Sequence, residues 1–349
     1  MKIAWYTSGH GFGHISRSSV IIQELLKNPL LNEITLVSPR VNFLNDHPKL
    51  IKRNVKTDTG VYQKSSIEID INKTLRELEE FQGLKPELTG QETKFLQEWK
   101  PDLVISDVSS FPVFLAGKMG IPAIIISNFT WDFIYNYYGK YDKRFSEFAA
   151  EISSEYEYAA KKIILPFNCD FPESPNNIKT GVIGRKPSMD REGLRKKFRF
   201  SDNTRYILIS FGAYGLGELN LKLENLPADV MLVSADTKPV QNGTLQIDNE
   251  YYPDILRACD FVLTKPGYGI MSECFFSKTP VIYTGRGDFP EYQYLVNSLQ
   301  KHFVSFYITK EELENLDLKN ALYAKPDWPT ETLSDGLEQV VNQIISFSG

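Results

Sequence analysis

The segment SGHGFGHISR, residues 8–17, places three glycines and two histidines directly after an apolar run. Because glycine has no side chain and adopts positive φ, such a loop lets a substrate approach the backbone closely. A neutral imidazole accepts a proton near pH 7, which makes a histidine here a candidate general base. The loop offers His10 and His14 for such chemistry. His10 is either a second catalytic contact or a structural residue that donates to a neighbouring carbonyl.

A second glycine loop, LTKPGYGIMSE, spans residues 263–273, between an apolar strand pattern and a helix expected to begin near Ile270. The N–H groups and the dipole at a helix N-terminus attract phosphate oxygens. The pattern therefore predicts a phosphate site, although a plain tight turn with a solvated glutamate would have the same sequence. The residues that we expect to contact a nucleotide are Lys265, Gly267, Gly269 and, at a ribose diol, Glu273.

A third glycine loop lies in ISFGAYGLGE, residues 209–218, after another apolar run. Its glycines allow a ligand to approach closely, or they serve only a flexible turn. We predict that Gly212 lines the same crevice as the loop that carries Lys265.

The sequence lacks motifs that would assign other chemistries. It has neither the P-loop pattern nor the dinucleotide fingerprint, which disfavours kinases and dehydrogenases. It has no Asp-x-Asp motif and no cysteine–histidine cluster at metal-ligand spacing. We therefore expect backbone amides and cationic side chains to neutralise a bound diphosphate, with no metal ion and no other cofactor.

Short apolar runs alternate with helix-like periodicity, which predicts an α/β fold with parallel sheets. The alternation stops and then restarts, so we expect two Rossmann-like domains facing a cleft. The predicted strands lie at 2–7, 33–38, 101–107, 122–127, 161–167, 205–211, 230–235, 260–265 and 280–285. The predicted divisions are an amino-terminal domain at 1–168, a linker at 169–200, a carboxy-terminal domain at 201–332, and a helical segment at 333–349 that could cross between the domains.

The composition limits the partners and the location. A net charge of -5 and a pI near 5.6 disfavour binding to nucleic acid. The three cysteines form no disulfide framework, which indicates a reducing compartment. No apolar stretch is long enough to span a membrane. The expected location is the cytoplasm, with peripheral membrane contact left open.

These motifs resemble those of the GT-B nucleotide-sugar glycosyltransferases. Phe12-Gly13-His14 is similar to the Gly-Gly-His of the bacterial enzymes that form lipid II, and Ser272-Glu273 is similar to their donor helix. A closer likeness is to the amino-terminal half of plant-type L-arabinokinases, which share SGHGFGH, an NFTWDFIY-like stretch as at residues 128–135, and KPGYG followed by Ser-Glu. That likeness runs from residue 1 to about residue 300.

The resemblance implies that the amino-terminal domain binds the acceptor and that the carboxy-terminal domain binds the sugar nucleotide. His14 would take the proton of the acceptor hydroxyl. The further donor contacts that it implies are Tyr268, Ser272, Glu291 and Gln293. The last two stand where the lipid II enzymes have paired glutamines, which leaves the donor sugar open. The acceptor contacts that we expect are Gly11, Gly13, Arg17, Asn128 and Trp131.

Three features have two interpretations each. Asp107 ends a predicted buried strand, where it either orients His14 or caps the following helix. Arg17 either meets an anionic acceptor or lies on the surface. The aromatic residues at 129–138 either contact a sugar or a lipid, or they form domain core or a dimer patch.

We therefore predict a metal-independent glycosyltransferase. It would move a sugar from a nucleoside diphosphate sugar, expected to be a UDP-sugar, to the hydroxyl of an unknown acceptor such as a lipid or a glycan. Two alternatives are a nucleotide-sugar epimerase on the same scaffold and a non-catalytic module that binds sugar nucleotides.

Overall fold

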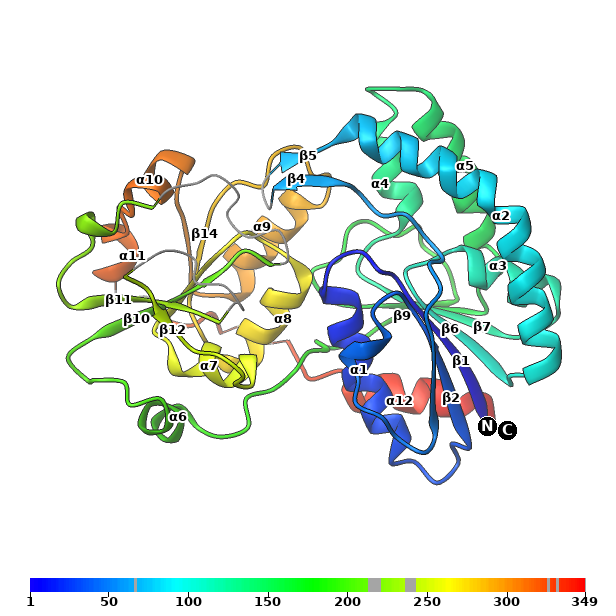
Figure 1. The fold of residues 1–349 in the computed structure, drawn as a ribbon, viewed down its shortest axis with the longest axis horizontal. Coiled ribbons are helices and arrows are strands. Elements are labelled where there is room, and N and C mark those ends of the chain that lie inside the picture. The colour runs from blue at the N-terminus through cyan, green and yellow to red at the C-terminus, as the bar shows by residue number, and fades with distance from the viewer. Residues whose placement is uncertain (66–67, 213–220, 236–242, 325–326, 331–332, 349) are drawn as a thin grey trace. The chain divides into compact units, whose positions relative to one another are not determined.

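A computed structural model gives the fold and describes residues 1–65, 68–212, 221–235, 243–324, 327–330 and 333–348. The chain divides into two compact units, whose elements are labelled in Figure 1. The first unit contains Met1–Tyr62, Asp70–Ile183 and Ser334–Gly349, and the second contains Gln63–Ile69 and Gly184–Leu333. The segment expected to be a linker, 169–200, is thus divided between the two units.

In the described part of the first unit, seven parallel strands form one sheet in the order β3-β2-β1-β6-β7-β8-β9. The strands are β1 (Lys2–Thr7), β2 (Glu33–Val37), β3 (Leu50–Arg53), β6 (Leu103–Asp107), β7 (Ala123–Ser127), β8 (Lys161–Ile164) and β9 (Asn177–Lys179). The helices are α1 (Gly13–Leu26), η1 (Val41–Phe43), α2 (Ile71–Trp99), α3 (Phe111–Lys118), α4 (Trp131–Tyr138), α5 (Arg144–Tyr156), α12 (Leu337–Ile345) and η4 (Ser346–Ser348).

The described part of the second unit has a six-stranded parallel sheet in the order β12-β11-β10-β13-β14-β15. Its strands are β10 (Arg205–Ser210), β11 (Val230–Ser234), β12 (Leu245–Gln246), β13 (Phe261–Thr264), β14 (Val281–Tyr283) and β15 (Ser305–Tyr307). The helices are α6 (Arg191–Lys197), η3 (Leu223–Asn225), α7 (Tyr252–Ala258), α8 (Tyr268–Ser277), α9 (Tyr292–His302), α10 (Lys310–Asn315) and α11 (Lys319–Leu322). Separately, β4 (Gln63–Ser65) pairs antiparallel with β5 (Glu68–Ile69).

The prediction of an α/β fold with a parallel sheet in each half is confirmed, and every predicted strand coincides with an observed one. The signal was clear because strands covered by helices on both faces read as nearly continuous apolar runs. In each sheet the strand order reverses once, between β1 and β6 and between β10 and β13. Such reversals are where open α/β sheets bind ligands.

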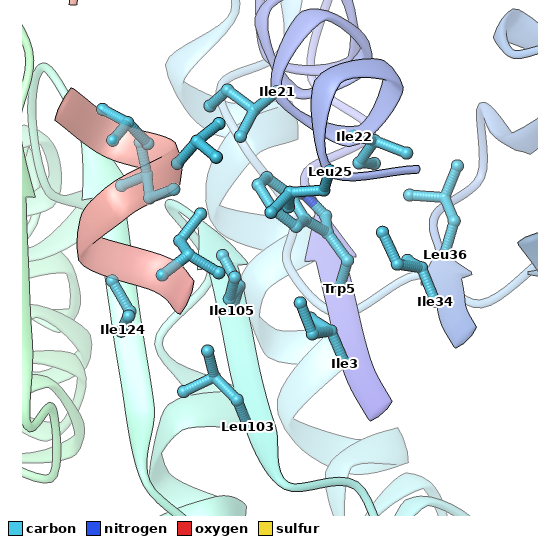
Figure 2. Packing of buried hydrophobic residues seen from close by; sticks show 14 of the residues in the cluster. Ile3, Trp5, Ile21, Ile22, Leu25, Ile34, Leu36, Leu103, Ile105 and Ile124 are labelled. Carbon is cyan, nitrogen blue, oxygen red and sulfur yellow. The ribbon is translucent and has the colours of Figure 1, made fainter. Parts of the chain in front are cut away.

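Alternate residues of β1 supply the cores on the two faces of the first sheet. Ile3 and Trp5 pack in one buried cluster with residues of α1 and α12, whereas Ala4 and Tyr6 pack in another with residues of α3. The alternation follows from the two-residue period of a strand. Figure 2 shows the first cluster, with Trp5 lying close to Leu25 of α1 and above the strand.

The segment between β3 and β6 contains a helix that the sequence analysis did not identify. Helix α2 begins after Asp70, whose side chain accepts a hydrogen bond from the backbone N–H of Lys73, and it continues for 29 residues. It buries the carboxylate of Glu92, which binds both terminal nitrogens of Arg53 and accepts a hydrogen bond from Tyr6. A buried carboxylate of this kind interrupts the apolar pattern from which a helix is predicted.

The aromatic stretch that follows β7 forms part of the core of the first unit. Phe129, Trp131, Tyr135 and Tyr138 are all buried, and Phe145 of α5 contacts both tyrosine rings. These four side chains are therefore core residues, whereas Phe133 is half-buried and Tyr137 is exposed. Among the described residues, no helix combines the length and the apolar character that crossing a bilayer requires.

The last helix packs within the first unit. Val340, Val341 and Ile344 of α12 are buried in the cluster that also contains Trp5. The segment before α12 pairs with the chain after β9, where the N–H of Gly336 donates to the Val182 carbonyl at 3.0 Å. The two backbones come so close that a Cβ on Gly336 would lie 2.4 Å from the carbonyl oxygen of Gly181.

We predict that Gly336→Ala destabilises the first unit by about 1–3 kcal/mol, because backbone atoms must move to admit the new methyl group. Chemical denaturation would measure the loss as a lower midpoint. Gly90→Ala is the matched control, since nothing lies within 4 Å of a Cβ at this exposed position of α2, and it should stabilise by up to about 1 kcal/mol. Equal midpoints for the two variants would contradict the close approach at Gly336.

Candidate functional site

The first candidate site lies at the strand-order reversal of the first sheet. Strands β1 and β6 are neighbours there, with Thr7 paired to Asp107 at their carboxyl ends. The glycine loop leaves β1 at this edge and leads into α1, which begins at Gly13. The topology therefore brings His14, in the first turn of α1, to the carboxylate that ends β6.

Asp107 is fully buried and is the centre of a polar cluster. Its Oδ1 lies 2.8 Å from His14 Nδ1 and also accepts a hydrogen bond from Arg17 Nη2. Its Oδ2 accepts from Arg17 Nε at 2.8 Å and from Ser18 Oγ at 2.8 Å. Helix α3 has Ser110 as its N-cap residue, so Asp107 does not cap that helix. Of the two interpretations of Asp107, the structure supports the one in which it orients His14.

The charge of Arg17 is neutralised inside this cluster. Burial opposes ionisation of Asp107, but the guanidinium of Arg17 and the His14 ring outweigh that cost and lower the pKa of the carboxyl to about 2. Arg17 is itself only 6% exposed and also donates to the side-chain oxygen of Asn128. Arg17 is therefore not a surface residue, and its charge is already paired.

The carboxylate fixes the orientation of the His14 ring. His14 Nδ1 lies 2.8 Å from Asp107 Oδ1, which only accepts hydrogen bonds, and 3.0 Å from Arg17 Nη2, which only donates them. We assign the hydrogen to Nδ1, because the contact with the carboxylate is the shorter one and Arg17 Nη2 already donates to Asp107 Oδ1. The remaining nitrogen, Nε2, then has a lone pair, and among the described residues no group hydrogen-bonds to it. An imidazole held this way is arranged as a proton acceptor, with the carboxylate placed to stabilise the imidazolium that forms.

The other expected acceptor residues surround this cluster. Gly11 adopts a positive φ of 65°. The His10 and Trp131 rings pack in a T-shaped arrangement, with their centroids 5.5 Å apart. Trp131 is 2% exposed, so it supports the site from beneath rather than forming an open surface. Asn128 uses its amide group within the protein, accepting from Arg17 and donating to the Pro166 carbonyl. Contact of these residues with an acceptor stays a prediction.

The second candidate site lies at the reversal of the other sheet, where β10 and β13 are neighbours. Gly212 follows β10 with positive φ, 72°, and the rest of its glycine loop, residues 213–220, lies outside the described residues. Helix α8 begins at Tyr268 after its N-cap residue, Gly267, which has no side chain with which to cap the helix. The amide of Gly269 lies in the first turn, where the N-terminus of a helix attracts an anion.

Two cations lie near this reversal. Burial and the neighbouring charge of Arg286 lower the pKa of Lys265 to about 6, while Glu291 opposes the shift. The lysine Nζ donates to the side-chain oxygen of Gln63 at 3.1 Å. Arg286 donates to Glu291 Oε1 at 3.1 Å, but its buried Nε has no hydrogen-bond partner among the described residues. An unpaired buried donor is costly, and an anionic ligand would satisfy it.

The remaining predicted donor residues have protein partners. Glu273, in α8, accepts a hydrogen bond from Arg185 Nε at 2.7 Å and is 5% exposed. Ser272 packs against Gly184, where a Cβ would lie 2.9 Å from the serine Cβ. Gln293 is on the exposed face of α9 and donates to Asn297 at 2.8 Å. Binding of ribose or sugar hydroxyls by Glu273, Glu291 and Gln293 stays a prediction.

Sequence reasoning missed several residues of both sites. Asp58 contacts Ser8 of the glycine loop, and Ser18 contacts Asp107. Arg185 pairs with Glu273, and Arg286 pairs with Glu291. Asp58 had a local signal, because KTDTG at residues 56–60 is a polar, glycine-terminated segment that follows a strand. The two arginines had none, since an arginine next to a loop is ordinarily solvent-exposed.

The amino-terminal part of the chain matches a known family. Residues 1–159 match the family model described as glycosyl transferase family 1. The solved glycosyltransferases that the chain resembles show, with the two parallel sheets and their reversals, that it has the GT-B fold. Its first 159 residues are similar to that glycosyltransferase family. The predicted GT-B fold and the predicted family resemblance are both confirmed.

One curated relative and two solved structures illustrate this likeness. The chain is 28% identical to L-arabinokinase of Arabidopsis thaliana over 328 residues, which is 91% of this chain and 31% of the relative, so it spans about a third of that protein. Phytolacca americana UGT2, solved with UDP-2-fluoro-glucose and pterostilbene, has a TM-score of 0.60 at 14% identity, covering 99% of this chain and 94% of the other. MurG of Acinetobacter baumannii also has a TM-score of 0.60, at 13% identity and 99% coverage of both chains.

The lowered pKa of Asp107 predicts a specific pH dependence of stability. A carboxyl whose pKa is depressed on folding stabilises the protein above its unfolded pKa, near 4, and loses this contribution as the pH falls through about 2. Asp107→Asn should be less stable than wild type at pH 7, and the difference should shrink by about 2 kcal/mol between pH 5 and pH 2. Denaturant unfolding of both proteins across that range measures the difference, and a constant gap would contradict the charge pairing.

Proposed function

We propose that the protein is a glycosyltransferase that moves a sugar from a UDP-sugar to an acceptor hydroxyl without a metal ion. The observation that carries the proposal is the buried pair of His14 and Asp107, which leaves Nε2 of the histidine as a proton acceptor at the strand-order reversal of the first sheet. A purely structural histidine at a helix start does not require a buried carboxylate that is itself held by an arginine and a serine.

In the proposed reaction, the acceptor hydroxyl gives its proton to Nε2 of His14 as its oxygen attacks the anomeric carbon of the sugar. The bond between that carbon and the diphosphate breaks, and its electrons stay on the leaving diphosphate. Asp107 stabilises the imidazolium form of His14 without taking the proton itself. The glycosylated acceptor, UDP and the proton taken up by His14 together contain all the atoms of the two substrates.

The second unit would stabilise the charge that develops on the leaving diphosphate. Lys265, the unsatisfied Nε of Arg286 and the amide of Gly269 are the donors that we assign to this role. Lys265 would be largely neutral in the ligand-free protein at pH 7 and would take up a proton as the diphosphate binds. The lysine therefore adds its positive charge only when the anion is present.

The comparisons support the donor class but not its sugar. The likeness to Phytolacca americana UGT2 is at the level of fold, and that protein was solved with UDP-2-fluoro-glucose and pterostilbene. L-arabinokinase is three times longer than the matched region, so its activity is not carried over. We also assign the reaction to a reducing, cytoplasmic compartment, because the chain has only three cysteines and all three are buried.

The proposed role of His14 predicts a selective kinetic defect. His14→Ala should lower the rate of sugar transfer by roughly 10²- to 10⁴-fold, the usual contribution of a general base, while the affinity for UDP stays within about twofold. The assay would measure UDP release from a panel of UDP-sugars with pooled acceptor alcohols, in the presence of EDTA. Activity of the wild type in EDTA is part of the expected result.

Two outcomes would contradict this proposal. If wild-type protein binds UDP-sugars but transfers nothing to any acceptor, the non-catalytic module becomes the better description. If His14→Ala loses UDP affinity instead of rate, the glycine loop is a nucleotide site. His47→Ala is the matched control, because that histidine is exposed and lies away from β1 and β6, and it should leave both quantities unchanged.

The lowered pKa of Lys265 predicts that UDP binding takes up a proton. The affinity for UDP should fall as the pH rises above about 6, by up to about tenfold per pH unit, because the diphosphate requires the charged lysine. Lys265→Met should bind UDP more weakly at pH 6 and lack this decline. Isothermal titration calorimetry in buffers of different ionisation enthalpy measures both the affinity and the proton uptake.

Lys310→Met, at an exposed lysine of α10, is the control and should titrate like wild type. The terminal phosphate of UDP also titrates near pH 6, but this ionisation of the free ligand is the same in the experiments with every variant. The same pH slope in Lys265→Met and wild type would therefore exclude Lys265 from the diphosphate site.

A further inference from the structure

Asp58 connects two elements of the first unit through one buried side chain. It lies in the segment after β3 and is 8% exposed. Ser8 Oγ donates to its Oδ1 at 2.9 Å, and Trp131 Nε1 donates to its Oδ2 at 2.9 Å. Ser8 belongs to the glycine loop, and Trp131 is the first residue of α4. The carboxylate thus ties the loop that leads to His14 to the helix that supports it.

The hydrogen bonds of Ser8 fix the beginning of the glycine loop. Its backbone N–H donates to the carbonyl of Asp107 at 3.2 Å. Its hydroxyl accepts from the backbone N–H of His10 at 3.1 Å and uses its own hydrogen for Asp58. Without Asp58, the hydroxyl could turn away, and the loop would lose one of the contacts that define its path.

Trp131 forms the wall against which the catalytic histidine packs. Its ring centroid lies 6.5 Å from that of His14 and 5.0 Å from that of Phe129, and Phe129 in turn contacts the His14 ring at 5.7 Å. His10 packs edge-on against the same indole and lies over Gly60, where a Cβ would come within 2.6 Å of its Nδ1. The position of the indole therefore constrains both histidine rings.

The indole stacks on the Tyr135 ring, with centroids 5.7 Å apart, but it also borders an open space. A cavity of about 30 Å³ borders it, lined also by Asp58, Leu78, Lys85 and Tyr135. Atoms that face such a space lose the contacts that would otherwise restrain them. The hydrogen bond from Nε1 to Asp58 is thus a main restraint on this side of Trp131.

We propose that Asp58 is a positioning residue for the transfer reaction, which holds His14 at its working geometry by fixing the glycine loop through Ser8 and the indole of Trp131. The inference rests on the proposed function, because it assumes that His14 acts as the base. It assigns Asp58 no contact with substrate. Small displacements of a catalytic group have large kinetic effects, since a misplacement of about 1 Å can cost about 10²-fold in rate.

Two substitutions of Asp58 separate the effect of its hydrogen bonds from the effect of its negative charge. An asparagine at residue 58 can accept from Trp131 through its oxygen and donate to Ser8 Oγ through its amide, so it keeps both connections without the charge. Leucine has the same branched shape, with methyl groups in place of the two oxygens, and keeps neither connection. Burial raises the pKa of Asp58, and the donors Trp131 and Ser8 oppose that shift, so loss of the negative charge is itself tolerable.

The experiment compares Asp58→Asn, Asp58→Leu and Trp131→Phe. Asp58→Leu and Trp131→Phe should each lower kcat by about 10- to 100-fold with KM for both substrates within about threefold. Asp58→Asn should stay within about threefold of wild-type kcat. Because both damaging variants break the same connection, the double variant Asp58→Leu/Trp131→Phe should be little worse than either single one.

Tyr6→Phe is the matched control. It also removes a buried hydroxyl that donates to a buried carboxylate of the first unit, Glu92, but Glu92 remains paired with Arg53. It should leave kcat unchanged. A kcat for Asp58→Asn as low as that for Asp58→Leu would mean that the charge matters, and additive losses in the double variant would mean that Asp58 and Trp131 act separately. Either result overturns the proposal.

A second measurement separates this proposal from the proposed function. The indole N–H signal of Trp131 and the imidazole signals of His10 and His14 can be followed by NMR without any substrate. Asp58→Leu should speed solvent exchange of the indole N–H and shift both imidazole signals, whereas Asp58→Asn should not. If wild type transfers no sugar, the proposed function fails, and these signals still decide whether Asp58 positions the histidine. Unchanged imidazole signals in Asp58→Leu would overturn it, provided that the variant is folded by circular dichroism.

Discussion

The first site depends on the requirement that a buried charge be paired. Arg17 and Asp107 are both buried, they are 90 residues apart in the sequence, and each would be costly in isolation. Their pairing keeps Asp107 ionised, and an ionised Asp107 determines which nitrogen of His14 carries the hydrogen. The start of α1, the end of β6 and the chemistry of the imidazole are therefore linked by one electrostatic constraint.

The two units use the same topology for different chemistry. In each, a glycine loop leaves a parallel strand at the point where the strand order reverses. In the first unit the cation, Arg17, is satisfied by Asp107 and Asn128, so the residue left with free capacity is a proton acceptor. In the second, Arg286 is paired through one nitrogen and keeps an unsatisfied Nε near a lysine of low pKa. The first arrangement favours proton transfer, and the second favours an anion.

The precision of the first site comes from buried polar groups rather than from its loop. Glycines allow the loop to take its path, but they do not by themselves select one conformation. The hydrogen bonds of Ser8 to Asp58 and Asp107 and the indole of Trp131 provide that selection. The aromatic core of α4 and α5 then places Trp131, so that a stretch which resembles an exposed binding surface in the sequence acts as the support of the site.

The sequence by itself determined the α/β fold, the positions of nine strands, the GT-B resemblance and the glycine loops, because buried parallel strands and glycine loops leave local patterns. It did not predict the short edge strands β3, β9, β12 and β15. It also determined the candidate base, His14. Only the tertiary structure decided that Asp107 orients His14 rather than caps α3, that Arg17 is buried, and that Asp58 joins Ser8 to Trp131. These pairs lie 50 to 93 residues apart. Which residues meet over such separations depends on the order of strands in the sheet, and the apolar pattern of a strand records its burial but not its neighbours.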